Sequence, residues 1–192
     1  MYKRQLKGVT AKQITLRINS EGGSVFQGHA IYNTLRDHPA DINVKIDGLA
    51  ASIASIIAMA GDTIEMAENA FMMIHDPWTL AAGTADELRT QADMMDKVRE
   101  KLLNTYVKRT GGDEEKISNM MSEETWMDAE EALQHGFIDS INEENRMAAC
   151  VRHPESFKCV PDTLIAKRTP RKDRVKRDIN SYITGSLKSY KL

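Results

Sequence analysis

The sequence predicts an α/β fold built from repeated strand–turn–helix units. Residues Ile14–Ile18 alternate apolar and polar side chains, as a strand with one buried face does. Apolar positions then recur at helical spacing over residues 25–35. The same order returns with a strand pattern at Ile42–Ile46 and a nearly all-apolar helix from Ser52 to Met59. Two such units in succession favour right-handed crossover connections.

Glycine and polar residues punctuate these units. Asn19–Gly23 and Asp47–Gly48 have the composition of turns, and Gly61 ends the second helix. Two further short strands are predicted at Thr63–Met66 and Phe71–Ile74.

A long helical pattern follows from Thr84 to Thr110. Thr84 and Glu87 fit a capping box at its start, and Gly111–Gly112 ends it. Its apolar stripe consists of Leu88, Met95, Val98, Leu102 and Tyr106. Such a helix either mediates assembly or packs on its own sheet, and periodicity alone does not separate the two.

Bulk properties exclude several classes of protein. A chain of 192 residues with a net charge of −2 suits one soluble domain and has no global attraction to nucleic acid or anionic membranes. Its most apolar segment, Leu49–Ala60, is far shorter than the roughly 20 residues of a membrane span. Two cysteines, Cys150 and Cys159, suit a reducing cytoplasm better than a disulfide scaffold.

The composition changes after Ile141. Residues 167–177 contain seven basic side chains against one acid. We therefore predict a domain over residues 1–145 and a basic, flexible tail over residues 146–192, with partner or nucleic-acid binding as the less favoured interpretation of the basic run.

Four local patterns could carry chemistry. Ser52 lies at a strand-to-helix junction, where a hydroxyl projects and the next backbone N–H groups can stabilise an oxyanion, although most such serines only cap a helix. Gly22 and Gly23 allow a backbone N–H to face a ligand, or they form an ordinary turn. His75 leaves an apolar strand, as a general base or a structural histidine. The strand-exit context is absent from His29, His38, His135 and His153.

An acid before the predicted helix at Ala129–His135 could orient this histidine. Nothing local selects Glu124 over Glu123 or Asp128. A metal is not expected, because Cys150, His153 and Cys159 match no usual zinc spacing.

Taken together, the motifs resemble the proteolytic subunits of the Clp protease family. They occur in the family's order over about residues 14–141, and they are Ile18–Gly23, Gly48–Ser52, Met73–Pro77 and Ala129–Asp139. The resemblance implies a Clp protease/crotonase-like fold with a protruding handle helix, through which rings of identical subunits stack. It implies that Ser52 is the nucleophile, that His75 is the general base and that Glu124 is the third member of the catalytic triad. It also implies that the backbone N–H groups of Gly23 and Ile53 form the oxyanion hole and that Gly22 lies in the substrate loop. It implies no cofactor.

The closer likeness is to phage head maturation proteases, through Gly22–Gly28, Ile74–Trp78 and Glu124–Trp126. That likeness implies cleavage of scaffold or capsid proteins, in the host cytoplasm or the procapsid. A housekeeping Clp subunit served by an ATP-driven unfoldase is the nearest alternative. A crotonase-type acyl-CoA enzyme and a non-catalytic assembly relative are the others.

Three departures from the family pattern stand out. Glu21 replaces the proline usual before the paired glycines, and Glu124 replaces an aspartate. Relatives normally have a further strand and helix before the first motif, so a shortened domain, or replacement of that element by Met1–Gln13, is expected. A missing strand would expose a sheet edge.

Overall fold

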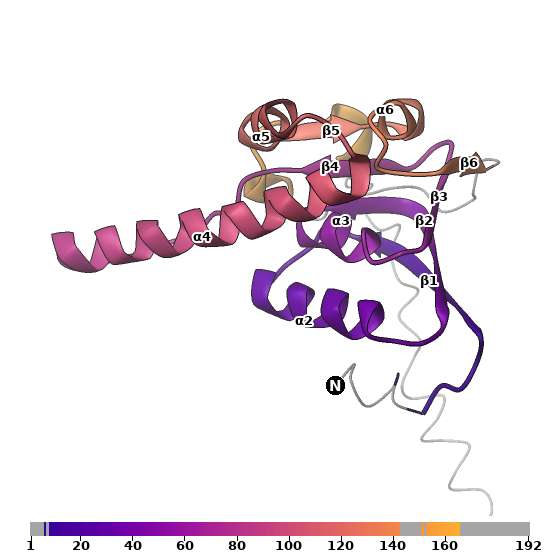
Figure 1. The fold of residues 1–192 in the computed structure, drawn as a ribbon. Coiled ribbons are helices and arrows are strands. Elements are labelled where there is room, and N and C mark those ends of the chain that lie inside the picture. Colours follow the sequence, from indigo (N-terminus) through magenta and orange to yellow (C-terminus); the bar gives the residue numbers. More distant parts are fainter. Residues whose placement is uncertain (1–5, 7, 143–150, 152, 166–192) are drawn as a thin grey trace, which may run out of the picture.

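The computed structural model describes residues 6, 8–142, 151 and 153–165 (Figure 1). Its strands are β1 (Gln13–Ser20), β2 (Asp41–Ala51), β3 (Thr63–Ala67), β4 (Phe71–Ile74), β5 (Thr125–Met127) and β6 (Ser140–Asn142). Its α-helices are α2 (Val25–Arg36), α3 (Ile53–Ala58), α4 (Ala85–Thr110), α5 (Glu114–Glu123) and α6 (Ala129–Gln134). The predicted α/β class and the repeated strand–turn–helix order are confirmed.

Strand β2 is the centre of the sheet, whose order is β5-β4-β2-β3-β6 with β1 also paired to β2. The first half of β2 pairs in parallel with β1 and β3, and its last residues pair in parallel with β4. Only β5 runs antiparallel to its neighbour β4 in the described sheet. Among the described residues, β1 pairs with β2 and with no other strand.

The predicted turn at Asp47–Gly48 is wrong, because β2 continues through it to Ala51. Asp47 is buried inside the strand, where both of its carboxylate oxygens accept hydrogen bonds from Arg17 of β1, at 2.7 and 2.8 Å. Bidentate pairing of this kind allows a carboxylate to lie within a sheet. The extension carries β2 directly to Ser52.

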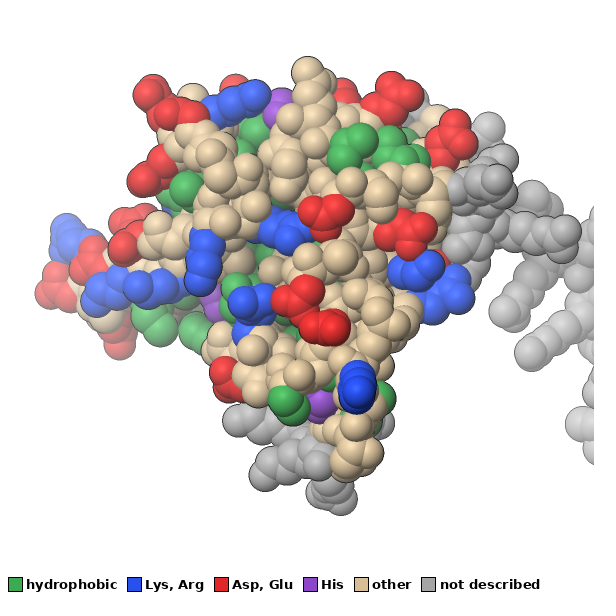
Figure 2. Space-filling view, turned by 45° about the vertical axis from the view of Figure 1, so that its right-hand side comes forward, with side chains coloured by type: hydrophobic (Ala, Val, Ile, Leu, Met, Phe, Trp, Pro, Cys, Tyr) green, Lys and Arg blue, Asp and Glu red, His purple; other side chains and the backbone are tan. Residues whose placement is uncertain are grey.

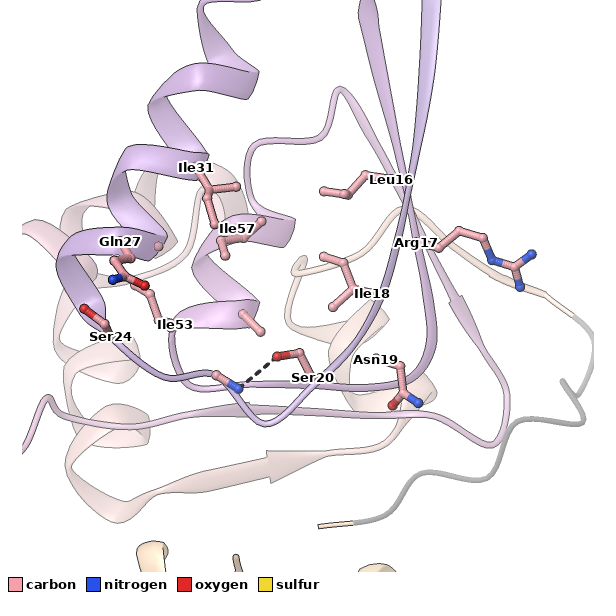
Figure 3. A pocket seen from close by; sticks show the side chains of 13 residues that line it. Leu16, Arg17, Ile18, Asn19, Ser20, Ser24, Gln27, Ile31, Ile53 and Ile57 are labelled. Atoms are coloured by element: carbon pink, nitrogen blue, oxygen red, sulfur yellow. Dashed lines mark hydrogen bonds between the residues drawn. The ribbon is translucent and has the colours of Figure 1, made fainter. Parts of the chain in front are cut away.

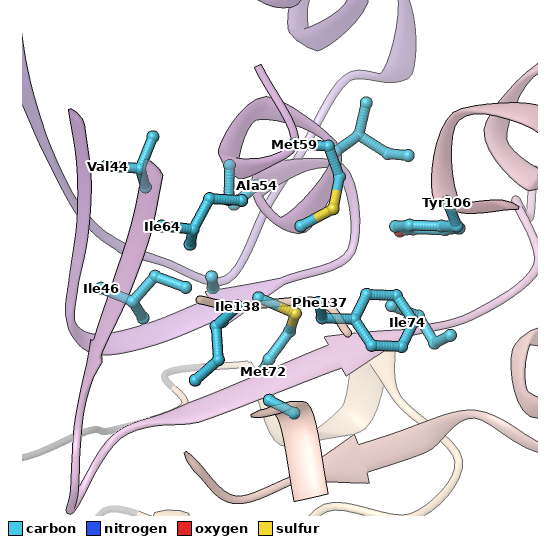
Figure 4. Close-up of a cluster of buried hydrophobic side chains, with 14 of the residues drawn as sticks. Val44, Ile46, Ala54, Met59, Ile64, Met72, Ile74, Tyr106, Phe137 and Ile138 are labelled. Atoms are coloured by element: carbon cyan, nitrogen blue, oxygen red, sulfur yellow. The ribbon is translucent and has the colours of Figure 1, made fainter. Parts of the chain in front are cut away.

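Most of the apolar core lies on the sheet face covered by α3 and the last turns of α4 (Figure 4). Alternate residues of β2 and β4 point to the other face, where Leu49, Ala51 and Met73 form a smaller cluster with Val151 and Leu164. Both faces of the sheet are therefore covered, and Val151 and Leu164, which follow β6 in the chain, help to cover the second face.

Helix α4 begins with the predicted capping box between Thr84 and Glu87 and ends at Gly111 in a left-handed conformation. Only its C-terminal part is buried, through Leu102, Leu103 and Tyr106. Its N-terminal part projects beyond the body, and Leu88 is 42% exposed there (Figure 1). In Figure 2 acidic and basic side chains are interspersed along this projecting end. The C-terminal part of α4 therefore packs on the body of its own chain, whereas a role of the projecting part in assembly stays a prediction.

Helix α5, which directly precedes Glu124, was not predicted from the sequence. The short helix expected at Ala129–His135 is present as α6 and stops at Gly136, whose φ is 77°. The domain boundary at residue 145 stays a prediction. The basic run at residues 167–177 lies outside the described residues.

Candidate active site

Ser52 forms the entire junction between β2 and α3. Its backbone angles are φ 56° and ψ −130°, in a region that residues with a side chain rarely adopt. The backbone N–H of Ser52 donates to the carbonyl of Met73 on β4, at 3.0 Å. A strained serine at a sharp strand-to-helix turn presents its hydroxyl outward, as nucleophiles do in many hydrolases.

The buried hydroxyl groups of Ser55 and Tyr106 stabilise this junction through hydrogen bonds. The Ser55 hydroxyl donates to the Ser52 carbonyl at 2.5 Å and lies 2.8 Å from the Tyr106 hydroxyl of α4. Because the single proton of Ser55 is used by Ser52, the Tyr106 hydroxyl donates to Ser55. Burial raises the pKa of Tyr106, so this hydroxyl keeps its proton. The packed part of α4 is thus tied to the Ser52 backbone.

The paired glycines lie against the same junction. Gly22 and Gly23 have φ angles of 100° and 145°. A Cβ on Gly22 would lie 2.8 Å from the Ala51 carbonyl oxygen and 2.8 Å from the Ser52 Cβ. Glycine is therefore required here both by the backbone angle and by the close approach.

His75 follows β4 and reaches Ser52 directly. Its Nε2 lies 2.8 Å from the Ser52 hydroxyl, and only 10% of its side chain is exposed. Burial lowers the pKa of His75, Glu124 and Asp76 raise it, and Lys158 lowers it. The net effect is a lowered pKa, which favours the neutral imidazole that can accept a proton.

Asp76, the residue after His75, is held by Arg99 of α4. Arg99 Nε donates to one carboxylate oxygen of Asp76 at 2.7 Å, and the Ser122 hydroxyl donates to the other at 3.2 Å. This contact fixes the chain immediately beyond His75 to α4 and α5. Asp76 thus belongs to an ion pair with Arg99, and no contact between its carboxylate and the His75 ring is present among the described residues.

Glu124 is the acid that the fold places beside His75. Its carboxylate is buried, with Oε2 3.7 Å from His75 Nδ1. Glu124 ends α5 in a left-handed conformation with φ 58°. The other two candidates are elsewhere: Glu123 is exposed, and Asp128 caps α6.

A segment beyond the predicted domain completes the surroundings of Glu124. We name residues 153–161 the C-terminal strap. Its backbone N–H groups at Lys158 and Cys159 donate to Glu124 at 2.8 and 2.9 Å, and Trp126 Nε1 donates at 3.3 Å. The Phe157 ring lies 6.0 Å from the His75 ring and 5.6 Å from the Trp126 ring, measured between centroids.

A cleft of about 370 Å³ opens above Ser52 and His75. Its other lining residues are Glu21, Gly22, Gly23, Val25, Pro77, Trp78, His153, Ser156 and Phe157. Of these, the three strap residues were missed by sequence reasoning, which treated His153 as background. The only available signal was Phe157, an isolated aromatic residue in a polar stretch.

A second hollow of about 390 Å³ lies between β1, α2 and α3 (Figure 3). Leu16, Ile18 and Ile57 point into it, whereas Arg17 points away. It adjoins the cleft through Gly22 but is lined by neither Ser52 nor His75.

The predicted residues therefore gather in one place: Ser52, His75 and Glu124 in a row, with Gly22 and Gly23 at the cleft and Ile53 opening α3. Among the described residues, no three His, Cys, Asp or Glu side chains are grouped as a metal site would require. Cys150 lies outside these residues. No described helix has both the length and the apolar character needed to cross a bilayer.

Comparison with known protein families gives a match to the family described as Clp protease over residues 6–145. The matched span covers most of the chain and contains every residue of the predicted site. The curled α/β sheet and the long α4 agree with that fold. Members of the family act on protein substrates and typically oligomerise. The chain thus belongs to the Clp protease family of serine peptidases.

Proposed function

We propose that this chain is an endopeptidase that cleaves peptide bonds through an acyl-enzyme on Ser52, with His75 as general base. The observation that carries the proposal is the 2.8 Å contact between Ser52 Oγ and His75 Nε2, made by a serine in a strained conformation. A serine that only caps a helix needs neither the strain nor the histidine.

The proposed reaction begins when the Ser52 hydroxyl attacks the peptide carbonyl and its proton passes to His75 Nε2. The imidazolium then gives this proton to the leaving amine, and water releases the acyl group by the same route. Glu124, 3.7 Å from Nδ1, stabilises the imidazolium electrostatically. No metal or nucleotide takes part in these steps.

The proposed oxyanion donors are the backbone N–H groups of Gly23 and Ile53. Ile53 is the first residue of α3, so its N–H has no carbonyl partner within the helix. Gly22 holds the glycine turn close to this N–H, since a Cβ on Gly22 would lie 3.2 Å from it. Removing one such donor typically slows acyl transfer ~10²–10³-fold.

We propose that α4 mediates assembly into a ring-forming homo-oligomer. Support comes from its division into a packed C-terminal part and a projecting N-terminal part over residues 85–97, in which Leu88 and Met94 are exposed. Projection of a capped helix of 26 residues, with apolar side chains exposed, is typical of a contact surface.

The proposed setting is procapsid maturation, with scaffold or capsid proteins as substrates in the host cytoplasm or the procapsid. Its support is the likeness of Gly22–Gly28, Ile74–Trp78 and Glu124–Trp126 to head maturation proteases. A housekeeping subunit would depend on an unfoldase and ATP to degrade folded protein. Cleavage of a capsid–scaffold assembly without ATP would favour maturation over that alternative.

The first test is labelling with a fluorophosphonate probe and peptide mapping, using Ser52→Ala and Ser140→Ala. Ser140 is an exposed serine at the start of β6, away from the cleft. We expect the label on Ser52 in the wild type and in Ser140→Ala, and none in Ser52→Ala. A folded, oligomeric wild-type protein that takes no label would overturn the peptidase proposal and favour an assembly protein.

A further inference from the structure

We propose that the C-terminal strap, residues 153–161, is a positioning part of the catalytic apparatus: its Lys158 and Cys159 N–H groups hold Glu124, and Phe157 covers His75. This inference rests on the proposed function. The strap lies beyond the span that matches the family, so the match itself assigns no role to it.

The strap meets a physical need of Glu124. A buried carboxylate is costly unless its oxygens accept hydrogen bonds. Among the described residues, three groups donate to Glu124, and two of them are the strap N–H groups at 2.8 and 2.9 Å. Hydrogen bonds to an ionised group are about twice as strong as neutral ones. Without the strap, Trp126 alone would remain, at 3.3 Å.

Position matters as much as charge. Glu124 is already in a left-handed conformation, and its carboxylate stands 3.7 Å from His75 Nδ1, beyond hydrogen-bond length. The two strap donors bind different oxygens, Lys158 to Oε2 and Cys159 to Oε1. They therefore fix the rotation of the carboxylate and keep Oε2 toward the imidazole.

The strap also spans the cleft. At one end the His153 N–H donates to Glu21 Oε2 at 3.3 Å, beside the paired glycines. At the other end it binds Glu124, and between them Phe157 lies against His75. His153, Ser156 and Phe157 form one wall of the cleft. A peptide substrate that occupies this cleft would therefore contact the strap.

Packing on the sheet anchors the strap. Phe157 and Val160 pack on the cluster that contains Leu49, Ala51 and Met73, the residues that lead toward Ser52 and His75. After the strap, the Leu164 carbonyl accepts a hydrogen bond from the Val151 N–H at 2.9 Å. The strap thus rests on the same strands that position the nucleophile and the base.

The test uses the full chain with Cys159→Pro, which removes one N–H donor, and Phe157→Ala, which uncovers His75. Thr163→Ala alters an exposed side chain outside the cleft and serves as the matched control. Fluorophosphonate labelling rates are measured from pH 5 to 9, and melting curves establish that each variant is folded. Cys159→Pro should lower the plateau rate ~10–100-fold, as misplaced catalytic groups do.

The pH dependence of the labelling rate distinguishes a positioning role of the strap from a general loss of structure in the variants. The Glu124 charge raises the pKa of His75, and weakening the hold on Glu124 lets this carboxylate move away from the imidazole, so the acid limb of Cys159→Pro should move to lower pH. Phe157→Ala exposes His75 to more water and so reduces the burial that lowers its pKa, and its acid limb should move to higher pH. Loss of folding alone would not move the two limbs in opposite directions.

Each outcome decides one question. Wild-type rates and limbs in both folded variants would overturn the positioning role. Faster labelling in the variants would also overturn it and would make the strap an inhibitory cover of the cleft. Absence of label on wild-type Ser52 would instead refute the proposed function.

Discussion

The two sides of the candidate triad are built differently. Ser52 directly follows β2 and His75 directly follows β4, and the ends of these two strands are paired, with Ala51 in register with Met73. Their contact of 2.8 Å is set by backbone pairing within one sheet. Glu124 instead ends a helix, stands 3.7 Å from His75, and accepts hydrogen bonds from two backbone N–H groups more than thirty residues away.

The difference teaches where precision comes from at this site. On the nucleophile side, backbone hydrogen bonds and a strained turn fix the reacting atoms. On the acid side, the carboxylate depends on hydrogen bonds from residues more than thirty positions away in the chain. We therefore expect substitutions to be most damaging on the nucleophile side and more graded on the acid side.

The largest expected effect compares His75→Ala with Glu124→Ala. Loss of the base should lower kcat by about 10⁴-fold or more, whereas loss of an acid partner in such triads costs less. Since Glu124 lies beyond hydrogen-bond length from His75, we expect a fall of roughly 10²–10³-fold for Glu124→Ala.

Steady-state peptide hydrolysis measures both variants, with Glu123→Ala as the control for removing a neighbouring exposed acid. An equal loss in His75→Ala and Glu124→Ala would break the comparison, because it would mean that Glu124 contacts the imidazole directly in the working enzyme.

On the nucleophile side, local patterns in the sequence made Ser52 and His75 candidates, and the family resemblance assigned their roles. A serine between a strand and an apolar helix, and a histidine at a strand exit, are visible within ten residues each. The choice of Glu124 came from family resemblance, because its burial depends on the α5 C-terminus and the strap. Those are long-range contacts, and no local pattern near Glu124 contains them.

The fold shows the same division. Apolar patterns predicted the first four strands, α2 and the capped α4, but not the short strands β5 and β6. The patterns failed at Asp47, where a charged residue lies inside β2 only because Arg17 of the neighbouring strand pairs with it. An ion pair between residues thirty positions apart leaves no trace in either local pattern.

A smaller effect tests the support beneath Ser52. Tyr106→Phe removes the hydroxyl that donates to Ser55, which in turn donates to the Ser52 carbonyl. We expect the free energy of unfolding to fall by about 0.5–1.5 kcal/mol, the usual worth of such a hydrogen bond. Labelling of Ser52 should slow as its strained backbone relaxes.

Urea denaturation and labelling rates measure the two parts of this prediction. Tyr32→Phe, at a half-buried tyrosine of α2 outside these contacts, is the matched control. A Tyr106→Phe protein that is less stable but labels at the wild-type rate would show that α4 supports the fold and not the nucleophile.

The smallest effect concerns the charge of Lys158 on the acid side. This exposed lysine donates to the Ser122 carbonyl at 3.3 Å and lowers the pKa of His75. Since the base must be neutral to accept the Ser52 proton, a lower pKa extends activity to lower pH. Lys158→Ala should therefore raise the pKa of His75 and move the acid limb of kcat/KM to higher pH, while Lys158→Arg keeps the charge and the limb in place. Added salt should bring the wild type toward Lys158→Ala, because exposed charges are screened.

The opposite result would change the interpretation of Lys158. An acid limb that moves to lower pH in Lys158→Ala would mean that the side chain acts chiefly by holding the strap against Glu124. The acid side would then depend still more on distant contacts.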